Sequence, residues 1–426
     1  MMHPLRKAYC RTFQLVFRLA LPILPYREPK QLDGLDSIVP LLKQKKIASV
    51  LLVTDRSVRS LGLTAPLEHA LEAAGVACAV YDGTVPNPTI QNVEEARQLY
   101  LDHGARAIIT VGGGSVMDCA KGVGARIARP HTPIQKMKGI LKVILPTPLT
   151  IAVPTTAGTG SEATLAAVIT DPAAKHKYPI NDFPLIPDYA VLDPSITLGL
   201  PPFITATTGM DALTHAVEAY IGRSTTKLTR AMSEEAARLI VQYLPRAYAD
   251  GSDLEARRAM LRAAYCAGVS FTRSYVGYIH GVAHSLGGQY GVAHGLANAV
   301  ILPMFLEEYG EACWEKLGKL ARAAGLADRS HSDEKAAKRF IAWIKKANRT
   351  MGIPEAIPEI RVQDIPQMAH HAEQESNPLY PVPKLMDQRE LETIYQKLMQ
   401  KEVILWTSKP LPQPSAPISK LEKHSA

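Results

Sequence analysis

Ala107-Ile-Ile-Thr-Val-Gly-Gly-Gly-Ser115 is the stretch that decides the fold. Five mostly apolar residues come first, and the glycines and the serine then lead into helical spacing. Two other apolar runs have the same build, Ile47–Val53 and Leu149–Val153, and each also ends in a polar or glycine-rich turn. Amphipathic helical spacing lies between Ile47–Val53 and Ala107–Val111, at Leu67–Ala74 and Asn92–His103. Short buried strands that alternate with helices are typical of a parallel sheet in an α/β unit.

The chain changes character near residue 200. Strand-like runs become scarce there, and helical spacing prevails at Leu228–Ile240, Arg258–Val269, Lys335–Asn348 and Glu390–Met399. A body with two parts is also the default for a chain of 426 residues. We therefore expect an N-terminal extension (1–35), an α/β domain (36–200), an all-helical domain (201–406) and a proline-rich disordered tail (407–426).

The composition is that of a globular protein whose basic residues are unevenly placed. Hydrophobic residues make up 46% and charged residues 21%, which argues against a disordered or fibrous chain. The formal net charge is +8, but residues 1–35 hold six basic and two acidic residues, and 407–426 hold three and one. Residues 36–406 are therefore almost neutral, so we expect no nucleic-acid partner.

The cysteines and the apolar runs indicate the cellular compartment in which we expect the protein. The five cysteines are scattered and form no Cys-x-x-Cys pair, which fits a reducing cytosol and argues against a disulfide scaffold or a cysteine-rich zinc module. No apolar run approaches the roughly 20 residues that span a bilayer, and no signal-peptide pattern is complete. We expect a cytoplasmic protein.

Two strand-to-helix turns are suited to a phosphate. In the first, Gly113, Gly114 and Ser115 let backbone N–H groups and a helix start approach an anion. The second is Thr155–Ser161, which is rich in hydroxyl groups and glycine. Either turn alone could be a tight connection, but two of them at the carboxyl ends of neighbouring parallel strands suit a pyrophosphate.

Asp55 lies at the end of the first predicted strand along the chain, just after the apolar run Ile47–Val53. A carboxylate at that position can accept hydrogen bonds from a ribose diol and repels a 2′-phosphate, so it favours NAD over NADP. The alternative is that Asp55 is only the N-cap of the next helix.

Carboxylate and imidazole groups gather in the helical part. Asp211 and His215 are four residues apart, as are His280 and His284, so each pair lies on one face of a helix. His294 follows a glycine-rich bend. One such pair is more often a cap or a core feature, but this density of ligands suits Zn²⁺ or Fe²⁺.

These segments resemble the iron-containing, group III alcohol dehydrogenase family. The resemblance covers about residues 36–405 and rests on GGGSVMDCAK (112–121), VPTTAGTGSEAT (153–164), GMDALTHAVEAY (209–220) and HGVAHSLGGQYGVAHGLANAV (280–300). It implies a Rossmann-like N-terminal dinucleotide-binding domain with a parallel sheet and an all-α C-terminal metal-binding domain, in a dehydroquinate-synthase-like architecture. The implied metal ligands are Asp211, His215, His280 and His294. The implied cofactor contacts are Asp55, Asn87, Gly113, Gly114, Ser115, Asp118, Thr155, Thr156 and Lys177.

The resemblance implies reversible hydride transfer between NAD(H) and a primary alcohol or its aldehyde, with Fe²⁺ as the metal and Zn²⁺ as the alternative. His284 matches a histidine that lies beside the metal, where it would relay a proton or orient the metal site. Two alternatives are a lyase of the dehydroquinate-synthase type and a polyol oxidation like that of glycerol dehydrogenase. We also expect a homodimer or larger homo-oligomer.

One stretch departs from the family pattern. Many members have a cysteine before an Asn-Pro-Arg sequence near the C-terminus, but here the corresponding region is Glu375-Ser-Asn-Pro-Leu-Tyr-Pro-Val-Pro383. Because that region borders the substrate cleft in the family, the identity of the alcohol stays open.

The N-terminal extension predicts a basic amphipathic helix. One face collects apolar residues (Tyr9, Phe13, Val16, Phe17, Ala20), and the opposite side is basic (Lys7, Arg11, Arg18). We expect the apolar face to pack on the protein's own domain or on another subunit. The less favoured alternative is a peripheral contact with an anionic membrane surface.

Overall fold

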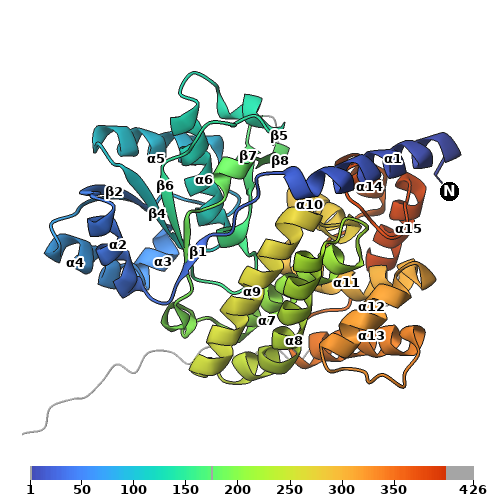
Figure 1. The fold of residues 1–426 in the computed structure, drawn as a ribbon. Coiled ribbons are helices and arrows are strands. Elements are labelled where there is room, and N and C mark those ends of the chain that lie inside the picture. Colours follow the sequence, from blue (N-terminus) through green and yellow to red (C-terminus); the bar gives the residue numbers. More distant parts are fainter. Residues whose placement is uncertain (1, 174–175, 400–426) are drawn as a thin grey trace, which may run out of the picture.

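The computed structural model describes residues 2–173 and 176–399. Six strands form a parallel sheet in the order β1-β9-β6-β4-β2-β3 (Figure 1). Their bounds are Lys30–Leu32 (β1), Ser49–Val53 (β2), Ala77–Tyr81 (β3), Ala107–Gly112 (β4), Leu149–Pro154 (β6) and Tyr189–Val191 (β9). The three strands predicted from apolar runs are β2, β4 and β6, which lie side by side in the middle of the sheet.

Helices cover both faces of this sheet. Alternate residues of β2 point to opposite faces, so Val50 and Leu52 pack with one group of helices and Leu51 and Val53 pack with the other. The first group is α2 (Ile38–Gln44), α3 (Arg56–Ser60) and α4 (Ala65–Ala73), and the second is α5 (Ile90–Asp102) and α6 (Gly114–Ala128). The predicted parallel α/β architecture is confirmed.

A smaller sheet lies beside α6. It has the order β5-β8-β7, in which β5 (Gly139–Ile140) pairs parallel with β8 (His176–Asn181) and β8 pairs antiparallel with β7 (Ala166–Asp171). This sheet was not predicted from the sequence: β5 has only two residues and β8 mixes polar and apolar residues, and the apolar run Leu165–Ile169 that forms most of β7 was overlooked. It brings Lys177, on β8, toward the cofactor turns.

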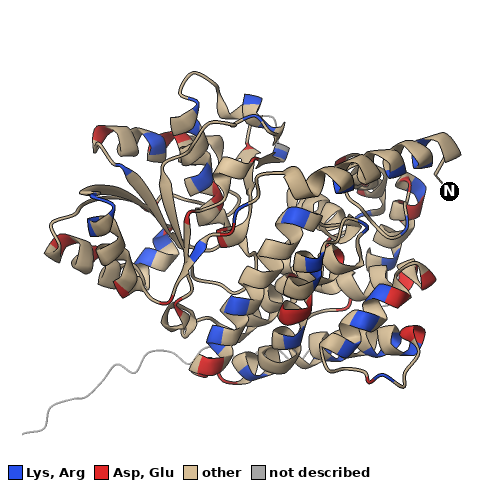
Figure 2. Cartoon of the chain, in the orientation of Figure 1, with Lys and Arg blue, Asp and Glu red and all other residues tan. Residues whose placement is uncertain are grey.

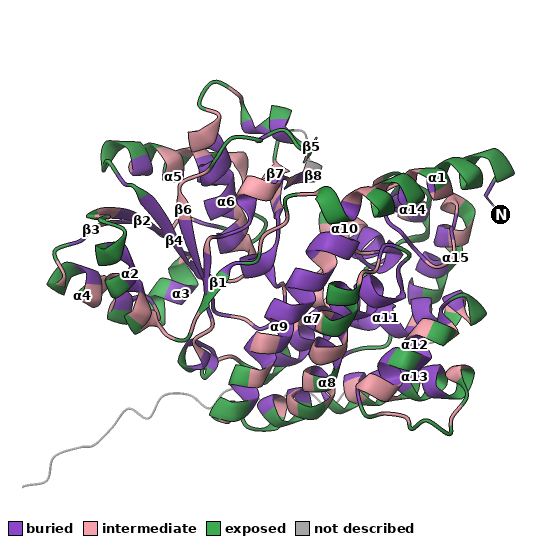
Figure 3. Cartoon of the chain, viewed as in Figure 1, coloured by how far each residue is buried: buried purple, intermediate pink, exposed green. Residues whose placement is uncertain are grey.

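After β9 the described chain is helical, as the sequence predicts. The helices are α7 (Pro202–Ile221), α8 (Lys227–Ala249), α9 (Leu254–Ser274), α10 (Tyr278–Tyr290), α11 (His294–Tyr309), α12 (Glu311–Ala323), α13 (Asp333–Thr350), α14 (Ile365–Ser376) and α15 (Gln388–Met399). Their apolar faces form one continuous core, and the central helices α7, α9 and α10 are mostly buried (Figure 3). The all-α C-terminal part is confirmed.

The N-terminal segment both joins the sheet and crosses to the helical part. Its residues Lys30–Leu32 form the edge strand β1, so the last part of the segment 1–35 belongs to the sheet. Before it, α1 (Pro4–Ala20) lies along the helical part near α14 (Figure 1). The expected tail at 407–426 lies outside the described residues. Within the described residues, no helix combines the length and apolar character needed to cross a bilayer.

The packed face of α1 differs from the predicted one. Its buried residues are Cys10 and Gln14, whereas Tyr9 and Val16 are exposed. The reason is tertiary: the Gln14 amide finds backbone carbonyl groups of residues 378–380 as acceptors, so a polar residue is satisfied in the contact.

Candidate metal centre and cofactor site

Four side chains from three helices converge in the helical part. Asp211 and His215 lie one turn apart on α7, His280 lies on α10, and His294 is the first residue of α11. One ligand atom of each lies within 4.8 Å of those of the other three. The expected ligand set is therefore brought together, and this arrangement can hold one metal ion.

Local sequence explains the convergence of the helices. Helix α10 ends at Gly291, whose φ of 70° is left-handed, and the chain turns back so that α11 begins at His294. Helix α11 also approaches α7 closely, because a Cβ on Gly295 would lie 2.7 Å from the Thr207 carbonyl oxygen. Without that glycine, His294 could not reach the other ligands.

Asn298 marks the centre of the cluster. Its Nδ2 donates to Asp211 Oδ1 at 2.6 Å and lies 3.2 Å from His280 Nε2 and 3.1 Å from His294 Nε2. Three acceptor atoms thus point at one position, which the amide protons occupy as a cation would. The Oδ1 atom of Asn298 is buried and has no hydrogen-bond partner among the described residues. These residues fit a bound metal ion.

The three imidazoles of the cluster are held neutral. Burial is the main cause that lowers the pKa of His215, His280 and His294, and that of His294 falls to about 3. The Asp211 carboxylate opposes this for His215 and His294. A neutral imidazole keeps a lone pair, which is the form that binds a metal.

Glu218 holds His280 from behind. Its Oε2 lies 2.5 Å from His280 Nδ1, and its Oε1 accepts from the Ile279 N–H at 3.0 Å. With its proton on Nδ1, the His280 ring presents Nε2 to the cluster, the usual arrangement of a carboxylate behind a metal-bound histidine. Glu218 was not predicted from the sequence, although its position three residues after His215 on the same helix face was a signal.

His284 lies next to the cluster and is paired with a second carboxylate. Its Nδ1 is 2.6 Å from Glu375 Oε1, and the Tyr380 hydroxyl donates to the same oxygen at 2.7 Å. The His284 ring stacks on that of His294, with centroids 5.2 Å apart. Both His284 and Glu375 are half-buried, so this pair reaches solvent.

Helix α14 reaches α10 because of a second glycine. A Cβ on Gly281 would lie 2.5 Å from Ser376 Oγ, so only glycine permits the contact that places Glu375 beside His284. Glu375 is the first residue of the stretch 375–383 that departs from the family pattern, but no role was predicted for it from the sequence. No sequence signal identified it, since it lies 91 residues from His284.

The first predicted phosphate turn has the expected form. Helix α6 begins at Gly114 with Gly113 as its N-cap, and no side chain caps it. A Cβ on Gly113 would lie in ordinary contact with Thr156 Oγ1 at 3.7 Å, so the second turn lies next to this helix start. A helix start without a side-chain cap among the described residues fits a phosphate group.

Three other predicted cofactor residues form a network at this turn. The Asn87 N–H donates to Ser115 Oγ at 3.2 Å, and its Oδ1 accepts from Lys177 Nζ at 2.7 Å. Asn87 has a left-handed φ of 58°. Burial lowers the pKa of Lys177, which the Asp118 and Glu375 carboxylates counteract. Lys177 therefore lies between the cofactor turn and the His284 pair.

The remaining predicted cofactor residues lie around the two turns. Asp118 Oδ1 accepts from the Ser161 hydroxyl at 3.2 Å, and burial raises its pKa. The Thr155 N–H donates to the Gly112 carbonyl at 3.1 Å, which ties the second turn to the first. Asp55 Oδ1 accepts from the Val58 N–H at 2.9 Å, so Asp55 does cap α3.

The second turn also joins the two halves of the site. A Cβ on Gly158 would lie 2.7 Å from Thr208 Cβ, so this turn lies directly against α7, the helix of Asp211 and His215. Buried Lys121 fixes the end of the turn through bonds to Ser161 and Thr164, each 2.7 to 3.0 Å long. The phosphate turns and the metal cluster are therefore neighbours.

Comparisons with known proteins agree with this geometry. The family model described as iron-containing alcohol dehydrogenase matches residues 30–194, and that of the Fe-containing alcohol dehydrogenase family, C-terminal, matches 205–399. The 1,3-propanediol dehydrogenase of Klebsiella pneumoniae is 36% identical over 387 residues, which cover 90% of this chain and 98% of the relative. An NAD-dependent methanol dehydrogenase of Bacillus methanolicus is 37% identical and covers 78% of this chain and 87% of its own length.

A solved structure shows the same fold. The crystal structure of a 1,3-propanediol oxidoreductase superimposes with a TM-score of 0.83 at 36% identity, covering 88% of this chain and 99% of that one. The expected enzyme class is confirmed, and the expected cofactors, NAD and iron, are confirmed at the level of the family. The lyase alternative has no support among these relatives, which are named as oxidoreductases. This chain belongs to the iron-containing alcohol dehydrogenase family.

Proposed function

We propose that this protein interconverts a small primary alcohol and its aldehyde by hydride transfer to and from NAD. The observation that carries this proposal is the convergence of Asp211, His215, His280 and His294 beside the phosphate turns. By their names, the two relatives act on 1,3-propanediol and on methanol, which are both primary alcohols.

The four converging side chains would hold an iron ion. When bound, iron would polarise the oxygen of the alcohol or aldehyde. NAD+ would accept the hydride from the alcohol, and NADH would give it to the aldehyde. The residues themselves fix the geometry, because Glu218 sets the ring of His280 and the buried core holds α7, α10 and α11. Burial also keeps water away from Asp211 and His280.

His284 is the proposed proton carrier. Glu375 holds its Nδ1, which leaves Nε2 free to take the hydroxyl proton during oxidation and to return it during reduction. The half-exposed position of the pair gives that proton a route to solvent. The contact with Glu375 on α14 favours a proton relay over a role in orienting the metal ligands, because the contacts of His284 with His280 and His294 are ring contacts and not hydrogen bonds to the ligand atoms.

The cofactor would lie across the ends of β4 and β6. Its pyrophosphate would lie at the start of α6, at Gly113, Gly114 and Ser115, and Lys177 and Asn87 lie at the same turn. Thr155 and Thr156 border the turn from the second strand, and Asp118 backs it from α6. These residues are proposed contacts.

The proposed activity is tested with a panel of alcohols and NAD on protein loaded separately with Fe²⁺ and with Zn²⁺. We expect net formation of NADH with short primary alcohols and the reverse reaction with their aldehydes. Glycerol and other polyols serve as the comparison, because preference for them would favour the glycerol-dehydrogenase-like alternative. No net NADH with any alcohol and either metal would contradict the proposal.

Asp55 is proposed to select NAD through the oxygen that does not cap α3. An Asp55→Asn variant keeps a capping side chain but removes the charge that would repel a 2′-phosphate. We expect kcat/KM for NADP to rise roughly fivefold, which corresponds to about 1 kcal/mol of lost repulsion. An unchanged ratio of NADP to NAD use would mean that Asp55 is only a cap.

We also propose a homo-oligomer that resides in the cytosol. All five cysteines are free, as a reducing compartment would leave them. Light scattering after gel filtration measures the number of subunits, and a monomeric enzyme with full activity would contradict the oligomer.

A further inference from the structure

Helix α1 is held on the protein by one narrow face. The Arg11 guanidinium donates to the Val382 and Pro383 carbonyls at 2.8 and 2.9 Å. The Gln14 amide donates to the Pro378 and Tyr380 carbonyls at 3.1 and 2.8 Å. An ion pair between Arg6 and Glu373 and an edge-to-face contact between Phe17 and Tyr275 complete the contact. The position of α1 therefore does not depend on its other face.

That other face is apolar and exposed. Six side chains on α1 and the following turn are between 54% and 84% exposed, namely Leu5, Tyr9, Leu15, Val16, Leu19 and Ile23. Most of them follow the spacing of one helix face, opposite to buried Cys10 and Gln14. A continuous stripe of this kind marks a surface that meets something apolar.

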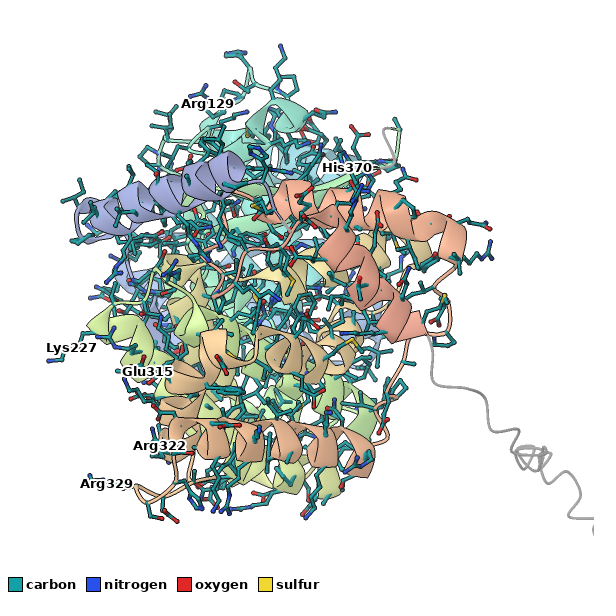
Figure 4. The ribbon with its side chains drawn as sticks, turned by 90° about the vertical axis from the view of Figure 1, so that its right-hand side faces the viewer. Arg129, Lys227, Glu315, Arg322, Arg329 and His370 are labelled. Atoms are coloured by element: carbon teal, nitrogen blue, oxygen red, sulfur yellow. The ribbon has the colours of Figure 1, made fainter. Side chains whose placement is uncertain are left out.

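The N-terminal segment that carries the stripe is basic. Residues 2–27 contain five arginine and lysine residues and no acidic residue, and Figure 2 shows basic but no acidic positions along α1. Lys7 and Arg18 are both exposed. Next to α1, burial together with Arg18, Arg223 and Arg230 lowers the pKa of Lys316 to about 8, so these cations lie close to one another. Lys227 projects from the same side of the molecule as α1 (Figure 4).

We propose that α1 docks this protein on the surface of a lipid bilayer that contains anionic headgroups. The apolar stripe would enter the boundary between headgroups and acyl chains, and the net positive charge of the segment would attract the anionic headgroups across the width of the helix, which is comparable to the Debye length. The helix lies flat in this arrangement, because its 17 residues are interrupted by basic side chains. This docking is independent of the proposed reaction.

Charge favours a bilayer over a second copy of this chain. If two α1 helices paired along their stripes, both pairing segments would carry net positive charge, because residues 2–27 contain five basic residues and no acidic residue. A surface of anionic lipids instead supplies the opposite charge to every one of these residues. The sequence favoured packing over a membrane contact, and the structure provides a separate face for each.

The test uses the full chain and two kinds of vesicle, phosphatidylcholine alone and phosphatidylcholine mixed with phosphatidylglycerol. We expect co-sedimentation with the mixed vesicles only, and weaker binding as salt is raised. The variant Leu5→Gln/Val16→Gln/Leu19→Gln should lower the apparent affinity at least roughly tenfold. Lys7→Gln/Arg18→Gln/Arg230→Gln should lower it similarly and reduce the salt dependence.

A matched control is Leu61→Gln/Val362→Gln, which removes exposed apolar side chains from other elements. It should bind vesicles as the unchanged protein does, and dehydrogenase turnover should be the same in all variants because none of these residues lies at the metal cluster or the phosphate turns. Equal binding to both vesicle types, no binding to either, or an unchanged affinity of the stripe variant would overturn the proposal. If the unchanged protein does not bind vesicles and the stripe variant forms smaller oligomers than it does, the proposal is overturned and the stripe belongs to a subunit interface.

Discussion

Helix α10 carries two histidines one turn apart, and each is paired with a carboxylate through its Nδ1 atom. The distances are nearly equal, 2.5 Å for His280 with Glu218 and 2.6 Å for His284 with Glu375. The surroundings differ. The side chains of the first pair are 3% and 2% exposed, whereas both side chains of the second pair are 27% exposed.

This difference separates two kinds of chemistry. A sealed pair cannot exchange its proton with water, so its carboxylate would fix the ring and strengthen Nε2 as the proposed ligand. A pair that reaches solvent can gain and lose a proton in each turnover, which a relay requires. The same two residue types thus have different proposed roles because of burial alone.

The largest expected effect is that of His280→Ala. Loss of one ligand from a cluster of four should leave the purified protein with little metal, and activity should fall by roughly a thousandfold or more. NADH binding, measured by fluorescence, should persist because the phosphate turns belong to the α/β half. If the variant keeps its metal and its turnover, His280 is not a ligand.

His284→Ala should come next. Removal of a general acid–base typically lowers kcat by about a hundredfold or more, while metal content should match that of the unchanged protein. Metal analysis and steady-state kinetics on the same sample distinguish the two histidines. Should metal be lost along with activity, His284 supports the metal site and does not act as a relay.

Glu218→Gln probes the sealed pair from its carboxylate side. Replacing the partner behind a metal ligand typically weakens metal affinity by about 10- to 100-fold. Titration with a competing chelator measures that affinity, and excess metal should restore much of the turnover. Restored turnover without any change in affinity would contradict the role assigned to Glu218.

Glu375→Gln should have the smallest effect of the four. Glutamine keeps the size of the side chain and can still accept from Nδ1, but it removes the negative charge beside the proposed relay. We expect kcat to fall about tenfold, with KM and metal affinity nearly unchanged. A variant that changes only KM would make Glu375 a substrate contact.

Much of the fold could be predicted because its central parts have local signals. Strands β2, β4 and β6 are buried on both faces and therefore read as apolar runs. The edge strand β1 and its neighbour β9 were not predicted, since each has only three residues and depends on the adjacent strands for hydrogen bonds. In the small sheet, β5 has only two residues and β8 mixes polar and apolar residues, whereas the apolar residues of β7 were overlooked.

The N-terminal helix shows where sequence periodicity misleads. A broad apolar arc predicts that some face of α1 will pack, but it does not specify which part of the arc. The contact was decided by Arg11 and Gln14, whose partners are carbonyl groups more than 360 residues away in the chain. Hydrogen-bond satisfaction at that distance cannot be read from helical spacing.

The α/β and helical halves, the two proposed phosphate turns and the four candidate ligands could all be predicted from the sequence, because each corresponds to a short local pattern. Only the tertiary structure decided which carboxylate stands behind each histidine, since Glu218 and Glu375 approach α10 from helices α7 and α14. It also decided that His280 is sealed and His284 is open. Burial depends on how distant helices pack, and no local pattern in the sequence specifies that.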